Sequence, residues 1–273
     1  MELLKYLDKF KEIETPFYFY DIDLLKQTFE QATREAATIP NSTVHFAIKA
    51  NDNSIILRYA QQYGFGIDAV SGGEIQKSID CGFKGKQIMF AGVGKTDKEI
   101  LSGIDHDILC FNAESEPEIE IINHLAAQRG KVARIALRVN PNVDAHTHKH
   151  ITTGLEENKF GISLDDMVRV IRQVQSLANV EYYGLHFHIG SQILEYDCLV
   201  ELSKKINEIQ DQLEAEGIQT KSINVGGGLG VDYNDPMGNP LPDFKGYFQT
   251  FKDYLKLRPG QSFHCEPGRA LTA

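Results

Sequence analysis

The chain has 273 residues, of which 42% are hydrophobic and 24% are charged, and its formal net charge is −10. This composition is typical of an ordinary soluble globular protein, and the length is sufficient for one large domain. The negative charge argues against nucleic acid or an anionic membrane as a partner, because both attract basic proteins. It is compatible with a cationic small molecule.

No apolar run approaches the roughly 20 residues that span a bilayer, and the first residues lack the apolar segment of a signal peptide. Cys81, Cys110, Cys198 and Cys265 are scattered without close pairing. The sequence therefore indicates neither a disulfide framework nor a zinc knuckle, and we expect a cytoplasmic protein.

Short apolar runs alternate with amphipathic segments along most of the chain. After a strand at Phe17–Tyr20 and a helix over 24–37, we expect strands at 44–49, 66–70, 87–91, 107–111, 133–140, 181–189, 222–225 and 262–266. Helices are expected at 54–63, 72–81, 96–103, 115–129, 164–177, 198–216 and 244–256. Eight strands that alternate with helices predict a parallel sheet closed into a (β/α)₈ barrel, of the α/β class. A doubly wound open sheet is the alternative.

Both ends of the chain depart from a complete barrel protein. The strand at 17–20 would be a ninth strand, and the last strand has no helix after it, although the helix at 24–37 could fill that gap in the ring. We expect residues 1–20 to form an N-terminal extension with a leading strand and residues 21–273 to form the barrel domain. The sequence looks truncated at its carboxyl end.

Two long loops follow predicted strands. The segment 140–160 has no clear periodicity, and the one from Gly226 to Pro242 is nearly as long. A loop of this length in a compact domain is usually a lid, a binding loop or a disordered segment. Both leave the carboxyl ends of strands, which is the edge where a parallel barrel carries its chemistry.

Alternation along the strands places charged and polar side chains on one face. Where one set of alternate residues is apolar, the other set contains Lys49, Asp68, Arg138, His188 and Glu266, from five different strands. A barrel interior normally takes branched apolar side chains, and buried charges are costly unless they are paired or used. This convergence predicts a functional site.

Several of these features have more than one interpretation. His186 and His188 could form a metal pair or could be hydrogen-bonded core histidines. The triplet Gly226–Gly228 could be a sharp turn, or a phosphate site, because it directly follows a strand. Gly268 and Arg269 could end a strand with a local ion pair, or could bind phosphate or carboxylate. A lysine, a carboxylate and a phosphate site together favour pyridoxal phosphate as the cofactor.

Five segments in order resemble motifs of the alanine-racemase-like pyridoxal-phosphate decarboxylases. They are HFAIKAN (45–51), DAVSGGE (68–74), HFHIGSQ (186–192), NVGGGLG (224–230) and CEPGR (265–269). The resemblance covers about residues 15–269. Within this family, HIGSQI (188–193) and the stretches Thr152–Gly154 and Asn158–Gly161 are similar to the diaminopimelate decarboxylases rather than to the ornithine and arginine types.

The resemblance implies a role for each matching residue. Lys49 would carry the cofactor, His188 would stack on its ring, and Glu266 would pair with the pyridine nitrogen. Arg269 would also meet a substrate carboxylate, and no metal is implied. The remaining cofactor-binding residues would be Ser191, Gly226, Gly227, Gly228, Gly268 and Arg269 at the phosphate, with Asp68, Arg138 and Pro267 completing the site.

The implied activity is decarboxylation of meso-2,6-diaminopimelate to L-lysine, the last step of lysine biosynthesis. Family members are usually homodimers and continue into a carboxyl-terminal β-domain that supplies a cysteine and a tyrosine to the partner's site. That domain is absent from this sequence, so the proton donor and the recognition of the substrate's distal group would lie outside it.

Three alternatives remain at this point. The first is another basic amino-acid or carboxynorspermidine-type decarboxylase. The second is a non-catalytic pyridoxal-phosphate-binding barrel. The third is a metal-dependent hydrolase built on His186, His188, Asp68 and Glu266, which leaves Lys49 and the glycine triplet without a role.

Overall fold

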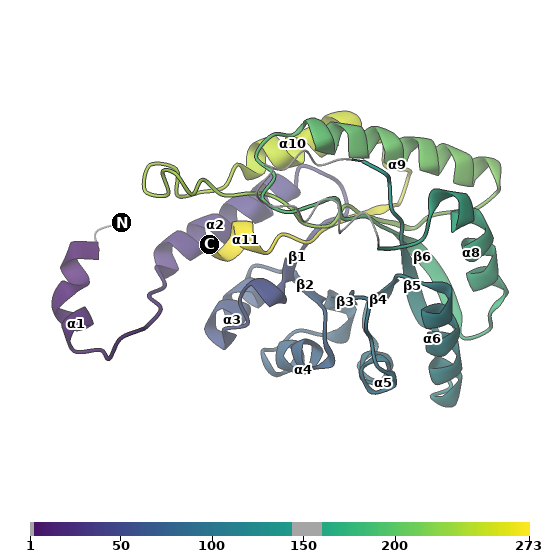
Figure 1. Ribbon diagram of the computed structural model, residues 1–273, viewed down its shortest axis with the longest axis horizontal. Coiled ribbons are helices and arrows are strands. Elements are labelled where there is room, and N and C mark those ends of the chain that lie inside the picture. Colours follow the sequence, from purple (N-terminus) through teal and green to yellow (C-terminus); the bar gives the residue numbers. More distant parts are fainter. Residues whose placement is uncertain (1–2, 144–159) are drawn as a thin grey trace.

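The computed structural model describes residues 3–143 and 160–273. The strands of these residues are all parallel and form a closed barrel, because β8 pairs with β1 as well as with β7 (Figure 1). They are β1 (Ser42–Ala47), β2 (Gly66–Ala69), β3 (Ile88–Phe90), β4 (Cys110–Ala113), β5 (Ala133–Arg138), β6 (Val180–His186), β7 (Ser222–Asn224) and β8 (Ser262–Cys265). The predicted (β/α)₈ barrel is confirmed.

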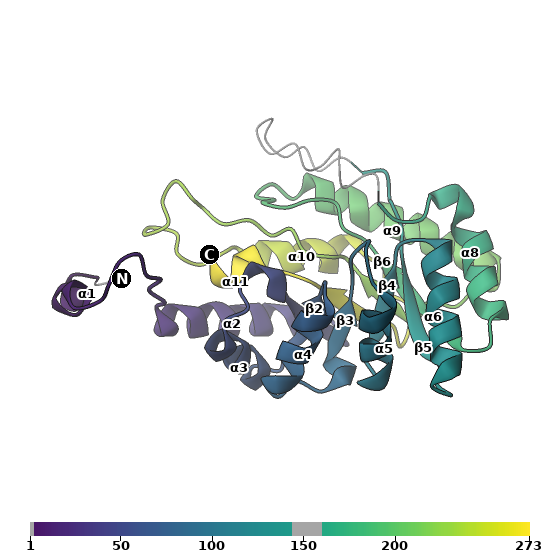
Figure 2. The ribbon, with the colours of Figure 1, turned by 60° about the horizontal axis from the view of Figure 1, so that its bottom comes forward.

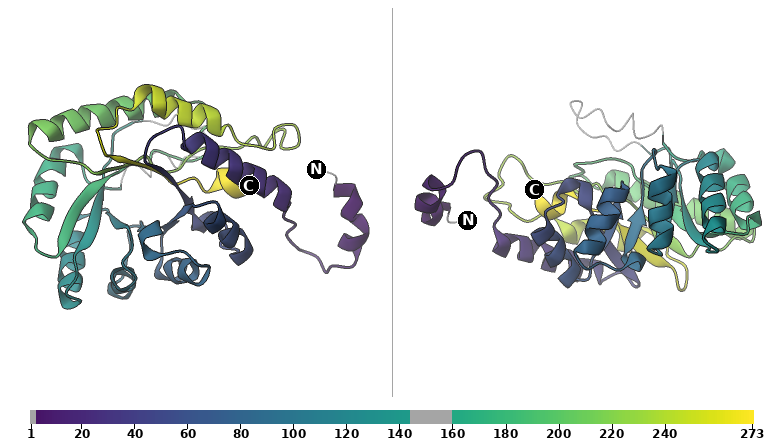
Figure 3. Two further views of the ribbon diagram at one scale, coloured as in Figure 1. Left: turned by 180° about the vertical axis from the view of Figure 1, so that it is seen from behind. Right: turned by 90° about the horizontal axis from the view of Figure 1, so that it is seen from below.

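Helices surround the barrel on its outer side (Figures 1 and 3). They are α3 (Ser54–Gln62), α4 (Gly72–Asp80), α5 (Asp97–Asp105), α6 (Glu116–Gln128), α8 (Leu164–Ser176), α9 (Asp197–Ala215) and α10 (Phe244–Tyr254). Their buried apolar faces, such as Ile119, Ile122 and Leu125 of α6, pack on the sheet and form the main hydrophobic core. In the described part of the chain, no helix has both the length and the apolar character needed to cross a bilayer.

The helix α2 (Ile22–Ala36) fills the place in the ring that the sequence leaves open. Asp21 caps its first turn, because the carboxylate accepts from the backbone N–H groups of Asp23 and Leu24. The helix packs against β1 and α10, and against the short α11 (Arg269–Thr272) at the carboxyl end of the chain. The predicted covering role of residues 24–37 is therefore confirmed.

The predicted strand at Phe17–Tyr20 is wrong, because these residues form no strand. The barrel is closed, so β1 is paired on both sides and offers no free edge to a ninth strand. Instead, the ring centroids of Phe17 and Phe19 lie 5.5 and 5.1 Å from that of Phe10 in α1 (Leu7–Lys11), which follows η1 (Leu3–Tyr6). Figure 2 shows α1 standing away from the barrel. The division into residues 1–20 and 21–273 stays a prediction.

Among the element boundaries that differ from the predicted ones, three concern β1, β4 and β6. The strand β1 ends at Ala47, and Lys49 lies in the 3-10 helix η2 (Ile48–Ala50), so the lysine sits on the rim of the barrel. The strand β4 begins at Cys110 because Asp107 adopts a φ of 51° in a turn after α5. The strand β6 ends at His186, which places His188 in the following loop.

The interior of the barrel is polar. Buried polar side chains that the strands and their carboxyl ends contribute are His45, Asp68, Asn112, His186, Ser222, Asn224, His264 and Glu266. His45 Nε2 lies 2.9 Å from His264 Nδ1, and burial lowers the pKa of His45 to about 4 and that of His264 to about 3. Both imidazoles are therefore neutral at physiological pH, and they fill the barrel below the rim without adding charge.

The strands β6 and β7 are packed closely at Gly184, where a Cβ atom would lie 2.2 Å from the carbonyl oxygen of Ser222. We expect Gly184→Ala to reduce the free energy of unfolding by roughly 1–3 kcal/mol, the usual cost of overpacking a core. Gly94→Ala is the matched control, because its Cβ would meet nothing within 4 Å, and surface changes of this kind usually stay within about 0.5 kcal/mol. Urea denaturation measures both, and equal stability of the two variants would contradict the described packing.

Candidate active site

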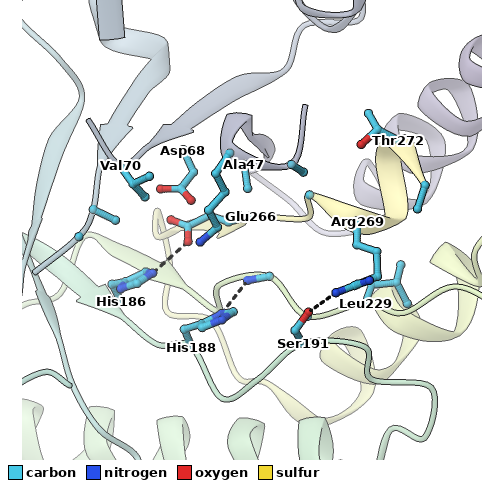
Figure 4. Close-up of a pocket in the computed structure, with 18 of the residues that line it drawn as sticks. Ala47, Asp68, Val70, His186, His188, Ser191, Leu229, Glu266, Arg269 and Thr272 are labelled. Atoms are coloured by element: carbon cyan, nitrogen blue, oxygen red, sulfur yellow. Dashed lines mark hydrogen bonds and ion pairs between the residues drawn. The ribbon is translucent and has the colours of Figure 1, made fainter. Parts of the chain in front are cut away.

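The carboxyl ends of the strands open onto a cavity of about 570 Å³ (Figure 4). The predicted site residues that line it are Lys49, Asp68, Arg138, His188, Ser191, Gly227, Gly228, Glu266, Gly268 and Arg269. Gly226 and Pro267 lie beside the cavity and are not among its lining residues. The N–H of Gly226 donates to Oδ1 of Asn224 at 2.9 Å, and the carbonyl of Pro267 accepts from the N–H of Ala47 at 3.2 Å.

Lys49 reaches the cavity from η2, and its side chain is solvent-exposed at the rim. Because β1 pairs with β8, Lys49 and Glu266 come from neighbouring strand ends. The positive charge of Lys49 opposes the rise in the pKa of Asp68 that burial causes. The lysine is thus an accessible amine beside the acidic side chains of the cavity.

Glu266 is a buried carboxylate held by three hydrogen-bond donors. Its Oε1 accepts from the side-chain amides of Asn112 at 3.2 Å and Asn224 at 2.6 Å, and its Oε2 lies 3.0 Å from Nε2 of His186. Burial by itself would raise the pKa of Glu266, but the proximity of His186 and the hydrogen bonds outweigh burial and lower it. The carboxylate is therefore ionised at neutral pH.

Asp68 faces the same cavity, but its pKa is raised whereas that of Glu266 is lowered. Figure 4 shows it beside Glu266, at the end of β2. Its side chain is buried, and its Oδ1 has no hydrogen-bond partner among the described residues. Burial, followed by the negative charge of Glu266, raises the pKa of Asp68. The cavity therefore holds one carboxylate that is fixed as an anion and one carboxyl that favours its protonated form.

The glycine triplet is packed directly on the ends of β6 and β8. A Cβ on Gly227 would lie 2.3 Å from the carbonyl oxygen of Glu266, and one on Gly226 would lie 2.3 Å from that of Phe187. Gly226 also has a φ of 73°, which favours glycine. The N–H of Gly227 donates to Nδ1 of His188 at 3.3 Å. The turn predicted at the glycine triplet is therefore present. It also places Gly227 and Gly228 on the cavity wall, so it is compatible with the predicted phosphate site.

Arg269 and Ser191 lie together in the cavity, away from the pair of acidic side chains (Figure 4). The guanidinium donates from Nη2 to Oγ of Ser191 at 3.5 Å and from Nη1 to Oη of Tyr233 at 2.5 Å. Its buried Nε has no partner in the described part of the chain. An arginine with an unused N–H, next to a hydroxyl and a glycine loop, is suited to an anion such as phosphate.

Arg138 is paired with a residue that the sequence analysis misses. Its Nη1 donates to both carboxylate oxygens of Glu114 at 3.0 and 2.9 Å, and the side chain of Glu114 is only 4% exposed. Glu114 also accepts from the N–H of Gly92 at 3.2 Å. The predicted strand at 107–111 ends too early, so Glu114 appears to belong to a loop, whereas it directly follows the true end of β4 at Ala113.

Asn112, Asn224 and Tyr233 are also missed. The parity test that selects Arg138 and His188 could have found the two asparagines, because Asn112 and Asn224 lie on the inward faces of β4 and β7. Asparagine carries no charge, so the free-energy cost of burying a charge does not identify it as a site residue. Tyr233 lies in an irregular loop, where a lone tyrosine has no diagnostic pattern.

His186 and His188 face different partners. His186 contacts Glu266, whereas His188 accepts from the backbone of Gly227. Among residues 3–143 and 160–273, no group of three or more His, Cys, Asp or Glu side chains is arranged to hold a metal ion.

Most of the predicted lid at 140–160, with the motif stretches Thr152–Gly154 and Asn158–Lys159, lies outside the described residues. At its end, the ring of Phe160 has its centroid 5.5 Å from the guanidinium of Arg138.

The residues of the cavity fit pyridoxal phosphate. Lys49 offers an amine for the aldehyde, and Glu266 offers an ionised carboxylate for the ring nitrogen. Ser191, Gly227 and the unused N–H of Arg269 offer an anion site in another part of the same cavity. The volume lies within the range of about 300–1,000 Å³ that is typical of small-molecule sites.

A family model of pyridoxal-dependent decarboxylases, covering their pyridoxal-binding domain, matches residues 25–273. The chain belongs to this family. Diaminopimelate decarboxylase from Bacteroides thetaiotaomicron is 52% identical over 265 residues, covering 97% of this chain and 69% of the relative. The enzyme of that name from Aquifex aeolicus is 37% identical, covering 94% of this chain and 62% of the relative.

Solved structures agree with the sequence comparisons. The crystal structure of diaminopimelate decarboxylase from Helicobacter pylori, complexed with L-lysine, has a TM-score of 0.89 and 37% identity to this chain. The match covers 97% of this chain and 66% of that one. The predicted resemblance and pyridoxal phosphate as the family's cofactor are confirmed. This pyridoxal-dependent decarboxylase chain spans about two thirds of the length of the relatives it matches.

The two carboxyls of the cavity lead to a prediction about stability and pH. Because the pKa of Asp68 is raised in the folded state, unfolding releases a proton above the ordinary aspartate pKa of about 3.9, and stability falls as pH rises toward the folded-state value. Asp68→Asn removes this effect. We expect the variant to be more stable than the unsubstituted chain at pH 8 by about 1 kcal/mol, the size of one unsatisfied buried polar group.

Thermal or urea unfolding without cofactor, at pH 5 and pH 8, measures the difference between the two chains. The exposed Asp253→Asn is the control and should show no pH-dependent difference. If Asp68→Asn gave the same difference in stability at both pH values, the raised pKa of Asp68 would be refuted.

Proposed function

We propose that the protein to which this chain belongs decarboxylates meso-2,6-diaminopimelate to L-lysine with pyridoxal phosphate. The observation that carries the proposal is a single cavity that holds Lys49, the ionised and buried Glu266, and a separate anion site at Ser191, Gly227 and Arg269. The 52% identity to a diaminopimelate decarboxylase, and the L-lysine complex of a related structure, support this substrate and product.

When bound, pyridoxal phosphate supplies an electron-withdrawing ring that stabilises the negative charge left by the departing carbon dioxide. We assign Lys49 to hold the cofactor through its amine, and Glu266 to accept from the ring nitrogen. The imidazole of His188 is fixed by Gly227, so it offers a rigid flat surface for the ring. Gly227, Gly228, Ser191 and Arg269 hold the phosphate, and Arg269 is also available to a substrate carboxylate.

The other basic amino-acid decarboxylases are less well supported as functional equivalents. The lysine/ornithine decarboxylase from Vibrio vulnificus and the arginine decarboxylase from Paramecium bursaria Chlorella virus are 19% and 22% identical to this chain, with TM-scores of 0.80 and 0.79. Sequence identity at this level supports only a shared fold.

We also propose a cytoplasmic homodimer. The dimer rests on the family resemblance. The location rests on the biosynthetic role and on four buried cysteines that are free thiols.

The assignment of Lys49 can be tested by chemical trapping. Borohydride reduction of the chain incubated with pyridoxal phosphate is expected to fix the cofactor to the peptide that contains Lys49. Lys49→Ala should abolish this labelling, whereas Lys86→Ala, an exposed lysine in η3 (Gly85–Gln87) at the opposite end of the barrel, should leave it unchanged. Peptide mass spectrometry identifies the labelled residue, and label on any other lysine would overturn the assignment.

The assignment of Glu266 can be tested by turnover. In the full-length protein, we expect Glu266→Gln to lower the kcat for carbon dioxide release from meso-diaminopimelate by at least about 100-fold, because the loss of the charge removes several kcal/mol of stabilisation. The cofactor should still be trapped at Lys49. The control is Glu181→Gln, at the amino end of the barrel, which should keep near-normal turnover.

Turnover of ornithine or arginine in preference to diaminopimelate would refute the proposed substrate.

A further inference from the structure

The donors around Glu266 come from three different strands and converge on one carboxylate. Asn112 is on β4, His186 is on β6 and Asn224 is on β7, and each of these residues is at most 2% exposed. Their shared property is that each presents an N–H to Glu266.

A count of the acceptor positions on Glu266 shows how many remain for a ligand after the three described donors have bonded. A carboxylate has about four lone-pair positions, two on each oxygen. Asn112 and Asn224 both donate to Oε1, and His186 takes one position on Oε2. One acceptor position therefore remains, on Oε2. A ligand that reaches Glu266 with one N–H completes the set.

The same count separates Glu266 from Asp68. Asp68 lies in the same cavity, but none of the residues that the structure describes donates to its Oδ1. Hydrogen bonds from N–H groups stabilise a carboxylate relative to the neutral acid, since the neutral acid accepts less strongly. The placement of Asn112, Asn224 and His186 thus decides which of the two acidic side chains stays charged.

We propose that Asn112, Asn224 and His186 are positioning residues that keep the shared proton on the ring nitrogen of bound pyridoxal phosphate rather than on Oε2 of Glu266. This inference rests on the proposed function. The step is the transfer of one proton between two atoms, the ring nitrogen and Oε2, with no change in bonding elsewhere. Each donor that is removed makes the carboxylate more basic, so the proton moves toward Glu266 and the ring loses positive charge.

Asn224 has a second contact that links the two ends of the cofactor site. Its Oδ1 accepts from the N–H of Gly226 at 2.9 Å, while its Nδ2 donates to Glu266. One side chain therefore fixes both the carboxylate and the first glycine of the loop. For this reason Asn112 is the better position for a test. Its amide N–H donates to Glu266, and none of its described hydrogen bonds reaches the glycine loop.

Other titratable groups also surround Glu266. They are His45, Asp68, Cys110, Tyr247, His264 and Cys265. Burial lowers the pKa of both histidines and raises the pKa of the thiols and the phenol, so these groups are uncharged between pH 6 and pH 9. Asp68 is the exception, and an Asp68→Asn background removes it.

The experiment uses pyridoxal phosphate labelled with nitrogen-15 in the ring, bound to the chain, with the nitrogen chemical shift followed against pH. This shift reports directly whether the ring nitrogen carries a proton. We expect a protonated ring in the unsubstituted chain, and in Asn112→Leu a ratio of ring-protonated to Glu266-protonated cofactor that is about tenfold lower at pH 7, which corresponds to the loss of one hydrogen bond to a charged group. Asn179→Leu is the control, since Asn179 bonds to the backbone of Lys131, away from Glu266.

Two substitutions of His186 separate hydrogen bonding from a general loss of packing. His186→Gln keeps an N–H donor within similar reach and should leave this ratio within about threefold of that in the unsubstituted chain, whereas His186→Leu should lower it about tenfold. If Asn112→Leu and His186→Leu leave the ring protonated as in the unsubstituted chain, or if His186→Gln lowers the ratio as much as His186→Leu, the proposal is overturned.

The result is distinguishable from failure of the proposed function. A chain that binds no pyridoxal phosphate at Lys49 refutes the function and this inference together. A chain that binds it at Lys49 with an unprotonated ring refutes only the inference. The ratios measured in the Asp68→Asn background should show the same order of variants, and a different order would also count against the proposal.

Discussion

An ionised carboxylate inside a barrel is the constraint on which the site depends. Placing a charge in a protein interior costs several kcal/mol unless hydrogen bonds compensate for it. Glu266 obtains these bonds from three strands that lie far apart in the sequence, and only closure of the barrel brings them within reach. Part of the polar interior follows from this requirement, because three positions that would usually be branched and apolar are here donors to one acidic side chain.

The rim of the barrel is held by a second set of buried charges. Lys95 has a side chain that is 1% exposed, and its Nζ donates to Glu118 at 2.6 Å and to the carbonyls of Gly92 and Asn112. Glu118 in turn accepts from the N–H of Glu114, which pairs with Arg138 on the cavity wall. The ends of β3, β4 and β5 are thus connected by two ion pairs, which a backbone hydrogen bond between Glu114 and Glu118 joins. These contacts fix the orientation of Arg138. The loss of any one partner would leave a buried charge unpaired, which is costly.

The family relationship and the physical description support each other at different levels. The comparisons establish a pyridoxal-dependent decarboxylase barrel, and the cavity explains why such a barrel suits that cofactor. An accessible amine, an anionic acceptor and an anion site with an unused N–H occupy separate parts of one cavity. The relatives are longer than this chain, which spans about two thirds of their length.

The sequence by itself determined the fold class and the set of charged residues at the site. Periodicity reveals eight strands alternating with helices, and side-chain parity selects Lys49, Asp68, Arg138, His188 and Glu266, because both properties depend only on neighbours along the chain. The sequence does not determine which strand ends meet, where β4 and β6 end, or that Phe17–Tyr20 has no edge to join. Those features depend on contacts between distant residues. For the same reason, only the tertiary structure decided that Glu266 is clamped as an anion by Asn112, Asn224 and His186 while Asp68, with equal chemistry, is not.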